Sequence, residues 1–494
     1  MPAKSSPGAD YITVASLKQT PVSALTVLLN LWLFYLDVPA KFKECRTILI
    51  PKRYPVSSPN DYRPITISSV VYRLFTKILS SRLNEWTVLN KRQKAFTAKV
   101  DRCGENTFML KSALASARRE HRELCIASLD IAKAFDSVSH NSIFRALVRH
   151  DVSASGICLI MNLLSDSFTR IEHADGTSEA MQMRRGVKLG DPMSPLLFSL
   201  VMDELFDKLD ELSAGFTICP GTTLCSLASA DDILLLSDCK AGLQSQLLTS
   251  YKFFQARNLA VNVDKCSSLR LYRVPKRRTV NVDVKPKFYL NPLEPTTLLP
   301  CFTASGFLKY LGVDFNPFGR RKCQIEKADI LIQRVCKAEL KPQQKLEMIR
   351  TYLVPRFLYS LTVGNPLAHT AKTIDKMIRQ AVKQILHLPL TTLCDDIFYI
   401  PMARGGLGFT NLSEVSDLSI LKLIRKMEAS DDPYSKPLYQ SKDEKQTDAA
   451  TGHPFSFELR DRCSQNTNGT NAQRPILGRV PRVWFPRVSG TLQQ

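Results

Sequence analysis

The spacing of apolar residues along the chain predicts helices that alternate with short strands through its N-terminal part. Helical spacing indicates helices at residues 20–36, 70–86, 105–119, 139–149, 155–167, 193–212 and 241–257. Short apolar runs indicate strands at residues 45–50, 65–69, 125–129, 223–228, 233–237 and 267–272, with a further pair within 169–185. Because the runs at 223–228 and 233–237 are joined by a tight turn, we expect a mixed or antiparallel sheet.

The rest of the sequence divides into three segments of different composition. Residues 274–300 hold five prolines and many basic residues, which favours an extended connection or ribbon. Residues 325–386 have helical spacing almost throughout and predict a bundle rich in Lys and Arg. After residue 430 the sequence is polar and poor in apolar side chains, so we expect a tail without stable structure.

The most apolar run of the chain covers residues 24–36. It is interrupted by Asn30, is too short to span a bilayer, and lies too far along the chain for a signal peptide of the usual form. We therefore predict a buried helix there, and no association with a membrane.

The composition is that of a globular chain with an unusual charge. Of the 494 residues, 44% are hydrophobic and 23% are charged, which excludes a disordered chain and predicts about two to four structural units. The formal net charge of +21 favours a polyanionic partner, of which nucleic acid is the commonest, although a merely basic soluble protein stays open. The 13 cysteines include no C-x-x-C pair, which favours free thiols in a reducing compartment.

Three carboxylates stand out because of their neighbours. Asp130 ends one apolar strand, and Asp231 and Asp232 lie at the turn between two others. If these strands meet, the repulsion between the carboxylates requires a counter-charge, which Mg²⁺ ions bound to carboxylates and substrate phosphates can supply. Taken alone, Asp231 and Asp232 also fit a hairpin turn and Asp130 fits a helix cap, so the residues by themselves leave both interpretations open.

Segments around these aspartates carry a family resemblance. In chain order they are RTILIPK (46–52), DYRPITISSVVYRLFTKILSSRL (61–83), QKAFTAKVDRCGENTFML (93–110), SLDIAKAFDSVSH (128–140), RRGVKLGDPMSPLLFSLVMDEL (184–205), LASADDILLLS (227–237), NLAVNVDKCSSL (258–269), FLKYLGVDF (307–315), KPQQKLEMIRTYLVPRFLYSL (341–361) and ARGGLGFTNL (403–412). From residue 45 to about residue 412 the chain resembles the reverse transcriptase of non-LTR (LINE-type) retrotransposons, and in particular the site-specific elements that insert in ribosomal RNA genes.

The resemblance implies an α+β right-hand polymerase fold with fingers, a palm built on an antiparallel sheet, and a helical thumb. The expected parts are an N-terminal helical extension (1–44), fingers (45–124), palm with a fingers insertion (125–300), primer grip (301–322), helical thumb and following segment (323–430) and a low-order tail (431–494). No zinc-ligand pattern and no acidic nuclease core follow residue 430, so we expect a partial or decayed copy without an endonuclease domain.

The function implied by the resemblance is that of an RNA-directed DNA polymerase. Such an enzyme adds dNTPs to a DNA 3′-hydroxyl primer on an RNA template and uses two Mg²⁺ ions, which Mn²⁺ can replace. One alternative is a catalytically weakened relic that only binds nucleic acid, and a more remote one is an enzyme similar to group II intron maturases or telomerase. The family implies a nuclear location, with a cytoplasmic ribonucleoprotein as the alternative, and the oligomeric state stays open.

The resemblance also assigns roles to single residues. Asp130 and Asp231 are expected to hold both ions, with Asp232 assisting and the backbone carbonyl of Ile131 as a further ligand. The residues expected at the incoming dNTP are Lys52 and Arg63 on the triphosphate, Phe135 as a steric gate against a ribose 2′-hydroxyl, Gly190 in the turn under the templating base pair, and Lys265 as a general acid. The alternatives are surface charges for the three cations and a core aromatic for Phe135.

Three positions depart from the family pattern. Leu189 stands where a glutamine usually contacts the dNTP, Ser229 replaces an aromatic residue at the primer terminus, and Asn258 replaces a glycine. Because Leu cannot hydrogen-bond the nucleotide and Ser cannot pack as a ring, we expect weaker dNTP binding or primer positioning. The other residues expected at primer and template are Tyr310, Leu311 and Gly312.

Overall fold

The computed structural model of the chain describes residues 2, 5–52, 54–96, 102–173, 176–275, 277–302, 304–317, 319–320, 325–363, 368–392, 394–430, 432–434 and 436. The chain divides into two compact units with separate apolar cores. The first unit comprises residues 1–311, 316–319 and 432–435, and the second comprises residues 312–315, 320–431 and 436–494. No helix in these described ranges is both long and apolar enough to cross a membrane.

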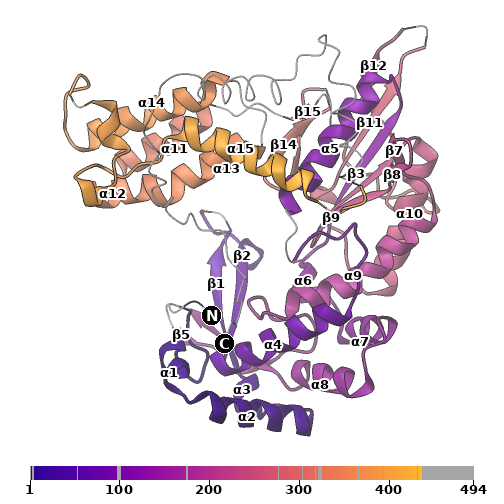
Figure 1. Cartoon of the computed structure of the whole chain (residues 1–494). Helices are drawn as coiled ribbons and strands as arrows, with labels where there is room; N and C mark the ends of the chain where they lie inside the picture. Colours follow the sequence, from indigo (N-terminus) through magenta and orange to yellow (C-terminus); the bar gives the residue numbers. More distant parts are fainter. Residues whose placement is uncertain are drawn as a thin grey trace. The chain divides into compact units, whose positions relative to one another are not determined.

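A five-stranded antiparallel sheet forms the centre of the first unit (Figure 1). Its strands lie in the order β12 (Val280–Val282), β11 (Ser267–Arg273), β3 (Leu124–Asp130), β10 (Asp232–Ser237) and β9 (Ser226–Ser229). Helices α9 (Ser194–Glu211) and α10 (Lys240–Ala256) share an apolar core with alternate residues of β3, and α5 (Arg102–Arg119) contacts both β3 and β9. Helices therefore cover both faces of the sheet, and the two central strands are buried.

A second sheet is built on the hairpin of β1 (Cys45–Pro51) and β2 (Tyr62–Ser68). Strand β4 (Phe168–His173) pairs in parallel with β1, and the short strands β5 (Gly176–Thr177) and β6 (Met181–Gln182) pair with β4. Helix α4 (Val70–Trp86) follows β2 directly, because the hydroxyl of Ser69 accepts a hydrogen bond from the N–H of Val71 (3.2 Å) and caps the helix.

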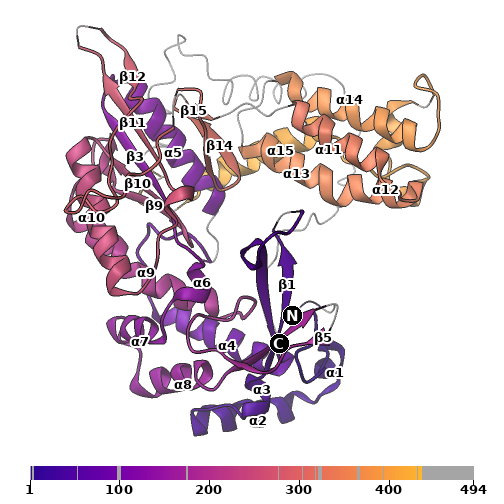
Figure 2. The same ribbon diagram turned by 180° about the vertical axis from the view of Figure 1, so that it is seen from behind.

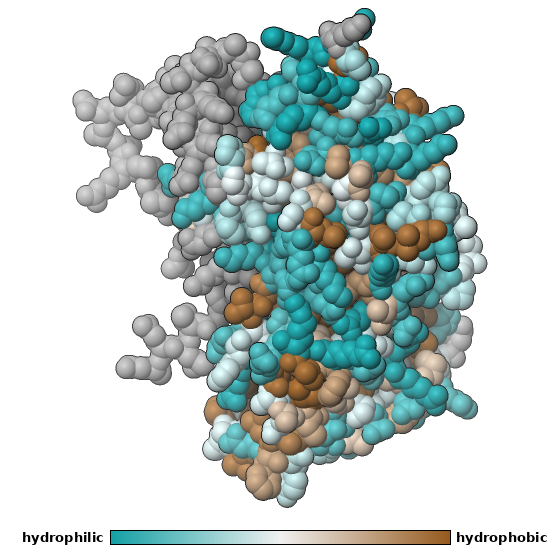
Figure 3. Space-filling model, turned by 90° about the vertical axis from the view of Figure 1, so that its right-hand side faces the viewer, coloured by the Kyte–Doolittle hydropathy of each residue, from teal (hydrophilic) through white to brown (hydrophobic). Residues whose placement is uncertain are grey.

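Helix α2 (Val22–Tyr35) lies on the surface, so the prediction of a buried helix at residues 24–36 is wrong. Of its residues only Trp32 is buried, at 3% exposure, whereas Phe34 is 80% exposed and Val27 is 60% exposed. Apolar side chains gather at the lower end of the space-filling view (Figure 3), at the height of α2 in Figure 1. The run is apolar on both sides of the helix, so hydropathy alone could not show that only one side packs against the unit.

Helices α7 (His140–Arg149) and α8 (Ala154–Leu164) extend the first unit away from the central sheet (Figure 2). Helix α7 packs against α9, and α8 packs against α7. Shorter elements of the first unit are α1 (Val14–Gln19), α3 (Ala40–Lys43), η1 (Pro59–Asp61), α6 (Ala134–Ser137), β7 (Phe216–Cys219), β8 (Thr222–Leu224), η2 (Val263–Lys265) and β13 (Leu308–Tyr310).

The second unit is a helical bundle of α11 (Ile325–Lys337), α12 (Pro342–Met348), α13 (Val354–Val363), α14 (Ala368–Ile385) and α15 (Leu412–Glu428). A π-helical turn at Ile349–Leu353 joins α12 to α13. Helix α11 packs against α14, and α15 packs against both α13 and α14. The shorter elements here are η4 (Asp395–Phe398) and η5 (Met402–Arg404), while β14 (Val313–Asn316) and β15 (Gly319–Arg320) lie where the chain passes between the units.

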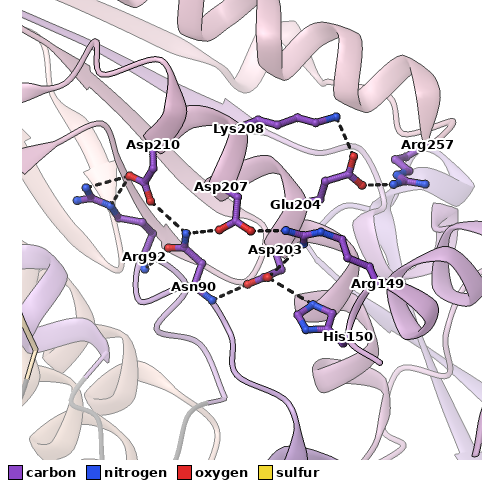
Figure 4. A network of polar contacts seen from close by, with 10 residues as sticks. All are labelled: Asn90, Arg92, Arg149, His150, Asp203, Glu204, Asp207, Lys208, Asp210 and Arg257. Atoms are coloured by element: carbon purple, nitrogen blue, oxygen red, sulfur yellow. Dashed lines mark hydrogen bonds and ion pairs between the residues drawn. The ribbon is translucent and has the colours of Figure 1, made fainter. Parts of the chain in front are cut away.

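One face of α9 binds residues of the connection between α4 and α5 (Figure 4). The acidic residues of this face follow helical spacing and are Asp203, Glu204, Asp207 and Asp210. The backbone N–H of Asn90 donates to Asp203 (2.6 Å), and its side-chain amide donates to Asp207 (2.7 Å). Arg92 forms an ion pair with Asp210 (3.1 Å). Two residues of the connection, Asn90 and Arg92, are therefore bound to α9.

Most elements predicted from apolar spacing are confirmed, among them the helix at 70–86, the strand at 125–129 and the helical bundle within 325–386. Strand β7 was not predicted, because its four residues alternate between buried and half-buried positions over too short a length to stand out. The mixture of helices with largely antiparallel sheets confirms the α+β class. Most of the expected tail, residues 431–494, lies outside the described residues.

Candidate active site

The carboxylates of Asp130 and Asp232 lie side by side because of the register between β3 and β10. The two residues are direct partners in the antiparallel ladder. Side chains of direct partners point to the same face of a sheet, with Cβ atoms about 5 Å apart. On the other side of β10, Asp232 is the partner of Ser229 in β9. The separate strand ends noted in the sequence therefore meet at one edge of the central sheet.

Asp231 lies in the two-residue turn between β9 and β10, directly after Ala230. Burial raises the pKa of Asp231 above its usual value, and the charge of Asp130 raises this pKa further. Burial also raises the pKa of Asp232, and the charges of Asp231 and Asp130 act in the same direction. The ionisation of Asp231 and of Asp232 is therefore opposed by neighbouring aspartates, so the three residues form one electrostatic group.

Cations from three other segments act on this acidic group. The Nζ atom of Lys265 is 3.5 Å from Oδ2 of Asp130, and 67% of its side chain is exposed. The charges of Arg63 and Lys265 lower the pKa of Asp231 without cancelling the effect of burial. The charge of Lys309 in β13 lowers the pKa of Asp232 in the same partial way. The predicted residues Lys265 and Arg63 are thus brought to the acidic group, and Lys309 was missed.

The acidic group is open rather than enclosed. In the part of the chain that the structure describes, no three His, Cys, Asp or Glu side chains converge closely enough to hold a metal ion by themselves. Mg²⁺ commonly takes only one or two carboxylates from a protein and completes its shell with water and substrate phosphates. Carboxylates whose ionisation is opposed by burial and by each other are stabilised by a bound cation. Asp130, Asp231 and Asp232 therefore fit a divalent ion that is shared with a substrate.

The aromatic ring of Phe135 packs against another aromatic ring in the apolar core. Its side chain stacks on Phe198 of α9, with ring centroids 4.9 Å apart and planes inclined by 23°. Phe198 is fully buried, whereas Phe135 is half-buried at the edge of that core. The packing is compatible both with a core aromatic and with a gate whose ring cannot turn aside.

Gly190 and Leu189 lie against strand β2. The N–H of Thr66 donates to the carbonyl of Leu189 (3.0 Å). Gly190 has a φ of +114°, and a Cβ atom there would lie 2.9 Å from the carbonyl oxygen of Thr66. Glycine is therefore required at this position by its backbone conformation and by the neighbouring strand.

Two further predicted residues, Lys52 and Ile131, differ in their surroundings. Lys52 is exposed, donates to the carbonyl of Asn60 (3.0 Å), and acts by its charge on Asp136 rather than on the three aspartates. Ile131 is buried and forms an isolated bridge with Val261.

Tyr310 of the predicted primer grip is close to the acidic group. Burial raises the pKa of Tyr310 well above its usual value, and the charge of Asp232 raises it further. Leu311 and Gly312 follow it with φ values of 47° and 76°, and Gly312 belongs to the second unit.

Three residues that support this site were not singled out from the sequence. Gln93 binds the backbone of Ala230, and Asn106 donates to the carbonyl of Ala228 (3.0 Å) and to the hydroxyl of Tyr310 (3.1 Å). The sulfur of Cys266 accepts a hydrogen bond from the N–H of Asp130 (3.5 Å).

The thiol of Cys266 is uncharged at neutral pH, because burial raises its pKa to about 11. It therefore adds no negative charge beside Asp130. The available signal for Gln93 and Asn106 was their place within the family-like segment 93–110, whereas nothing in the sequence pointed to Cys266.

The sequence of the chain matches the family model for reverse transcriptase (RNA-dependent DNA polymerase) over residues 50–315. The match covers more than half of the chain and includes all three aspartates, so the chain belongs to the reverse transcriptase family. The expected right-hand polymerase fold is thereby confirmed. Members of this family use divalent metal ions.

The chain is similar to Pol polyproteins of R2 retrotransposable elements, which confirms the resemblance to site-specific non-LTR elements. It is 33% identical to such a protein of Drosophila melanogaster over 421 residues, 85% of this chain and 39% of that protein. It is 36% identical to one of Popillia japonica over 434 residues, 86% and 59% of the two chains, and 36% identical to one of Nasonia vitripennis over 381 residues, 77% and 36%. The chain thus spans less than two thirds of the length of each of these relatives.

A solved structure of telomerase from Candida albicans with a fragment of telomeric RNA aligns with 87% of this chain and 69% of that chain. The sequence identity is 11% and the TM-score is 0.42, and similarity at this level adds nothing to the assignment.

Replacing Asp231 by Asn should stabilise the metal-free chain at neutral pH. A carboxyl whose pKa is raised in the folded state disfavours folding above its unfolded pKa of about 3.9, because the folded site must hold the charge. We expect Asp231→Asn to raise Tm at pH 7 on the order of 2 °C. The difference should shrink as the pH falls below the unfolded pKa, where the carboxyl becomes protonated in both states.

The measurement is thermal unfolding in a chelating buffer across this pH range. Asp238→Asn is the matched control, because Asp238 is exposed and lies at the opposite end of β10. A lower Tm for Asp231→Asn at pH 7, or a difference that does not change with pH, would contradict the electrostatic account.

Proposed function

We propose that the chain is an active RNA-directed DNA polymerase that extends a DNA primer on an RNA template by two-metal phosphoryl transfer. The observation that carries the proposal is the direct ladder pairing of Asp130 with Asp232, beside Asp231, in a chain of the reverse transcriptase family. Three neighbouring carboxylates at the edge of a sheet, completed by substrate phosphates, suit metal-assisted phosphoryl transfer. The net charge of +21 suits a nucleic-acid substrate.

In the proposed reaction the 3′-oxygen of the primer attacks the α-phosphorus of a dNTP, and pyrophosphate leaves. Two bound Mg²⁺ ions, or Mn²⁺ in their place, would make the 3′-hydroxyl a better nucleophile and stabilise the charge on the leaving group. Asp130 and Asp231 would hold both ions, with Asp232 and the carbonyl of Ile131 assisting. The raised pKa values of Asp231 and Asp232 support this assignment, because a bound cation relieves the cost of their charge.

The cations around the acidic group would bind and neutralise the triphosphate. Arg63 is exposed and acts on Asp231, so its guanidinium can reach a phosphate placed over that carboxylate. Lys265 is mostly exposed and only loosely paired with Asp130, so its ammonium can turn to the pyrophosphate and give it a proton. Lys52 lies further out and would contact the triphosphate only at its outer end.

Selection of the sugar would rest on Phe135. Its ring is fixed against Phe198, so a ribose 2′-hydroxyl in front of it would clash rather than displace it. Gly190 would keep the turn beside Thr66 free of a side chain under the base pair. Ser229, Tyr310, Leu311 and Gly312 would contact primer and template. The family resemblance leads us to propose a nuclear location for this activity, with a cytoplasmic ribonucleoprotein as the alternative.

Primer extension tests the proposal directly. The chain should extend oligo(dT) on poly(rA) with dTTP in the presence of Mg²⁺, and Asp231→Ala and Asp232→Ala should each reduce the rate by at least about a hundredfold, since each removes a carboxylate that holds the ions. Asp238→Ala, at the exposed end of β10, should retain the wild-type rate.

The alternative is a relic that keeps nucleic-acid binding and has lost turnover. It is favoured by Leu189 and Ser229, which replace a hydrogen-bonding and an aromatic residue of the family. A relic would bind primer–template with a strong salt dependence and show no Mg²⁺-dependent extension. That combination would overturn the proposal.

Restoring the family residues should improve nucleotide use. We expect Leu189→Gln and Ser229→Tyr each to lower the apparent KM for dTTP. For Leu189→Gln the decrease should be about fivefold, since one regained hydrogen bond is worth about 1 kcal/mol. Steady-state extension measures this, with Leu293→Gln as the control because Leu293 is 69% exposed. If neither variant lowers KM, the departures at these positions do not weaken the site.

A further inference from the structure

The turn that carries Asp231 is held by one buried side chain from outside the sheet. Oε1 of Gln93 accepts a hydrogen bond from the backbone N–H of Ala230 (2.9 Å), and Nε2 of Gln93 donates to the carbonyl of Ala230 (3.3 Å). Both backbone groups of one turn residue are therefore bound by one amide. Gln93 is only 3% exposed, so water cannot readily take over these bonds.

Ala230 is the residue of this turn whose conformation most needs support. Its φ of 60° is left-handed, a region that is costly for a residue with a Cβ atom and persists only where the surroundings fix it. Ala230 directly precedes Asp231. A change in the backbone angles of Ala230 would therefore redirect the carboxylate of Asp231 and shift Asp232 relative to Asp130.

Gln93 is itself fixed by the backbone of strand β9. It forms a parallel bridge with Ala228. The N–H of Lys94 donates to the carbonyl of Ala228 (3.2 Å), and the N–H of Ala228 donates to the carbonyl of Arg92 (3.3 Å). Oε1 of Gln93 also accepts a hydrogen bond from the N–H of Ala95 (3.1 Å), which fixes the direction of the side chain.

Hydrogen bonds and ion pairs bind the residues on both sides of Gln93 to neighbouring helices. Before it, Asn90 and Arg92 bind the acidic face of α9 (Figure 4). After it, Lys94 forms an ion pair with Glu105 of α5 at 2.6 Å, and the two side chains are 4% and 6% exposed. The segment that presents Gln93 to the turn is thus bound to two helices of the first unit, α9 and α5.

We propose that Gln93 is a positioning residue that sets the orientation of Asp231 and Asp232 for divalent-ion binding, acting through the backbone of Ala230. This inference rests on the proposed polymerase function, in which those carboxylates hold the ions. Groups that orient metal ligands commonly change metal affinity or activity by about 10- to 100-fold when they are removed. A side chain that only stabilised the fold would leave the requirement for Mg²⁺ unchanged.

The test compares Gln93→Met with a matched control, Gln246→Met. Methionine has a similar volume to glutamine but cannot replace its hydrogen bonds. Gln246 is fully buried and donates to the backbone carbonyls of Leu236 (3.0 Å) and Ala214 (3.2 Å) at the opposite end of β10. Both variants remove hydrogen bonds between a buried glutamine and the backbone, so both should lower Tm.

The Mg²⁺ dependence of primer extension separates the two roles. We expect Gln93→Met to raise the Mg²⁺ concentration for half-maximal extension about tenfold or more, with extension recovering at high Mg²⁺. Gln246→Met should leave that concentration unchanged. Equal Mg²⁺ dependence in the wild type and Gln93→Met, or an equal rise in Gln246→Met, would overturn the proposal.

Amide hydrogen exchange of the metal-free chain gives a second readout that does not depend on polymerisation. Gln93→Met should speed exchange at residues 229–233, whereas Gln246→Met should leave exchange there unchanged. Unchanged exchange at 229–233 in Gln93→Met would refute the positioning role even if the wild type extends primers. If the wild type extends no primer but exchange at 229–233 rises in Gln93→Met, the polymerase proposal fails, whereas the inference that Gln93 positions the turn is supported.

Discussion

The register between β3 and β10 is the constraint on which the site depends. Ile233 pairs with Leu129 and Leu235 pairs with Ala127, and these four residues face the same apolar core beneath α9 and α10. Because β10 is apolar on both faces, a shift by one residue would leave aliphatic side chains in that core but would also turn Asp232 into it. The cost of burying a carboxylate there therefore favours the pairing that brings Asp232 to Asp130.

The arrangement that brings these carboxylates together for the proposed function also lowers the local stability of the fold. Burial and the charges of neighbouring aspartates raise the pKa values of Asp231 and Asp232, and the charges of Arg63, Lys265 and Lys309 offset this only in part. The turn adds a second cost, because Ala230 is left-handed. Both costs are local. The apolar core keeps the strands in this arrangement, and the hydrogen bonds of Gln93 keep the turn in it. A site of this kind is preorganised for cations that the protein alone does not provide.

The sequence predicted what short-range patterns encode. Helix α4 was predicted with its observed ends because the apolar spacing of residues 70–86 is regular, and the structure adds that Ser69 caps it. The three aspartates were found from strand ends and from the family motifs. The exposure of α2 could not be predicted, because hydropathy does not show which side finds a partner. The bonds from Gln93 to Ala230 join residues 137 positions apart, and only the folded chain shows them.

Binding of Mn²⁺ shows directly whether these three aspartates together hold divalent ions. Electron paramagnetic resonance would count bound Mn²⁺ in the wild type, Asp231→Asn and Asp238→Asn, each with primer–template and a non-incorporated dNTP analogue. The account predicts bound ions in the wild type and in Asp238→Asn, and binding weakened at least about tenfold in Asp231→Asn. Equal binding in all three proteins would show that the ions are held elsewhere and would contradict the account.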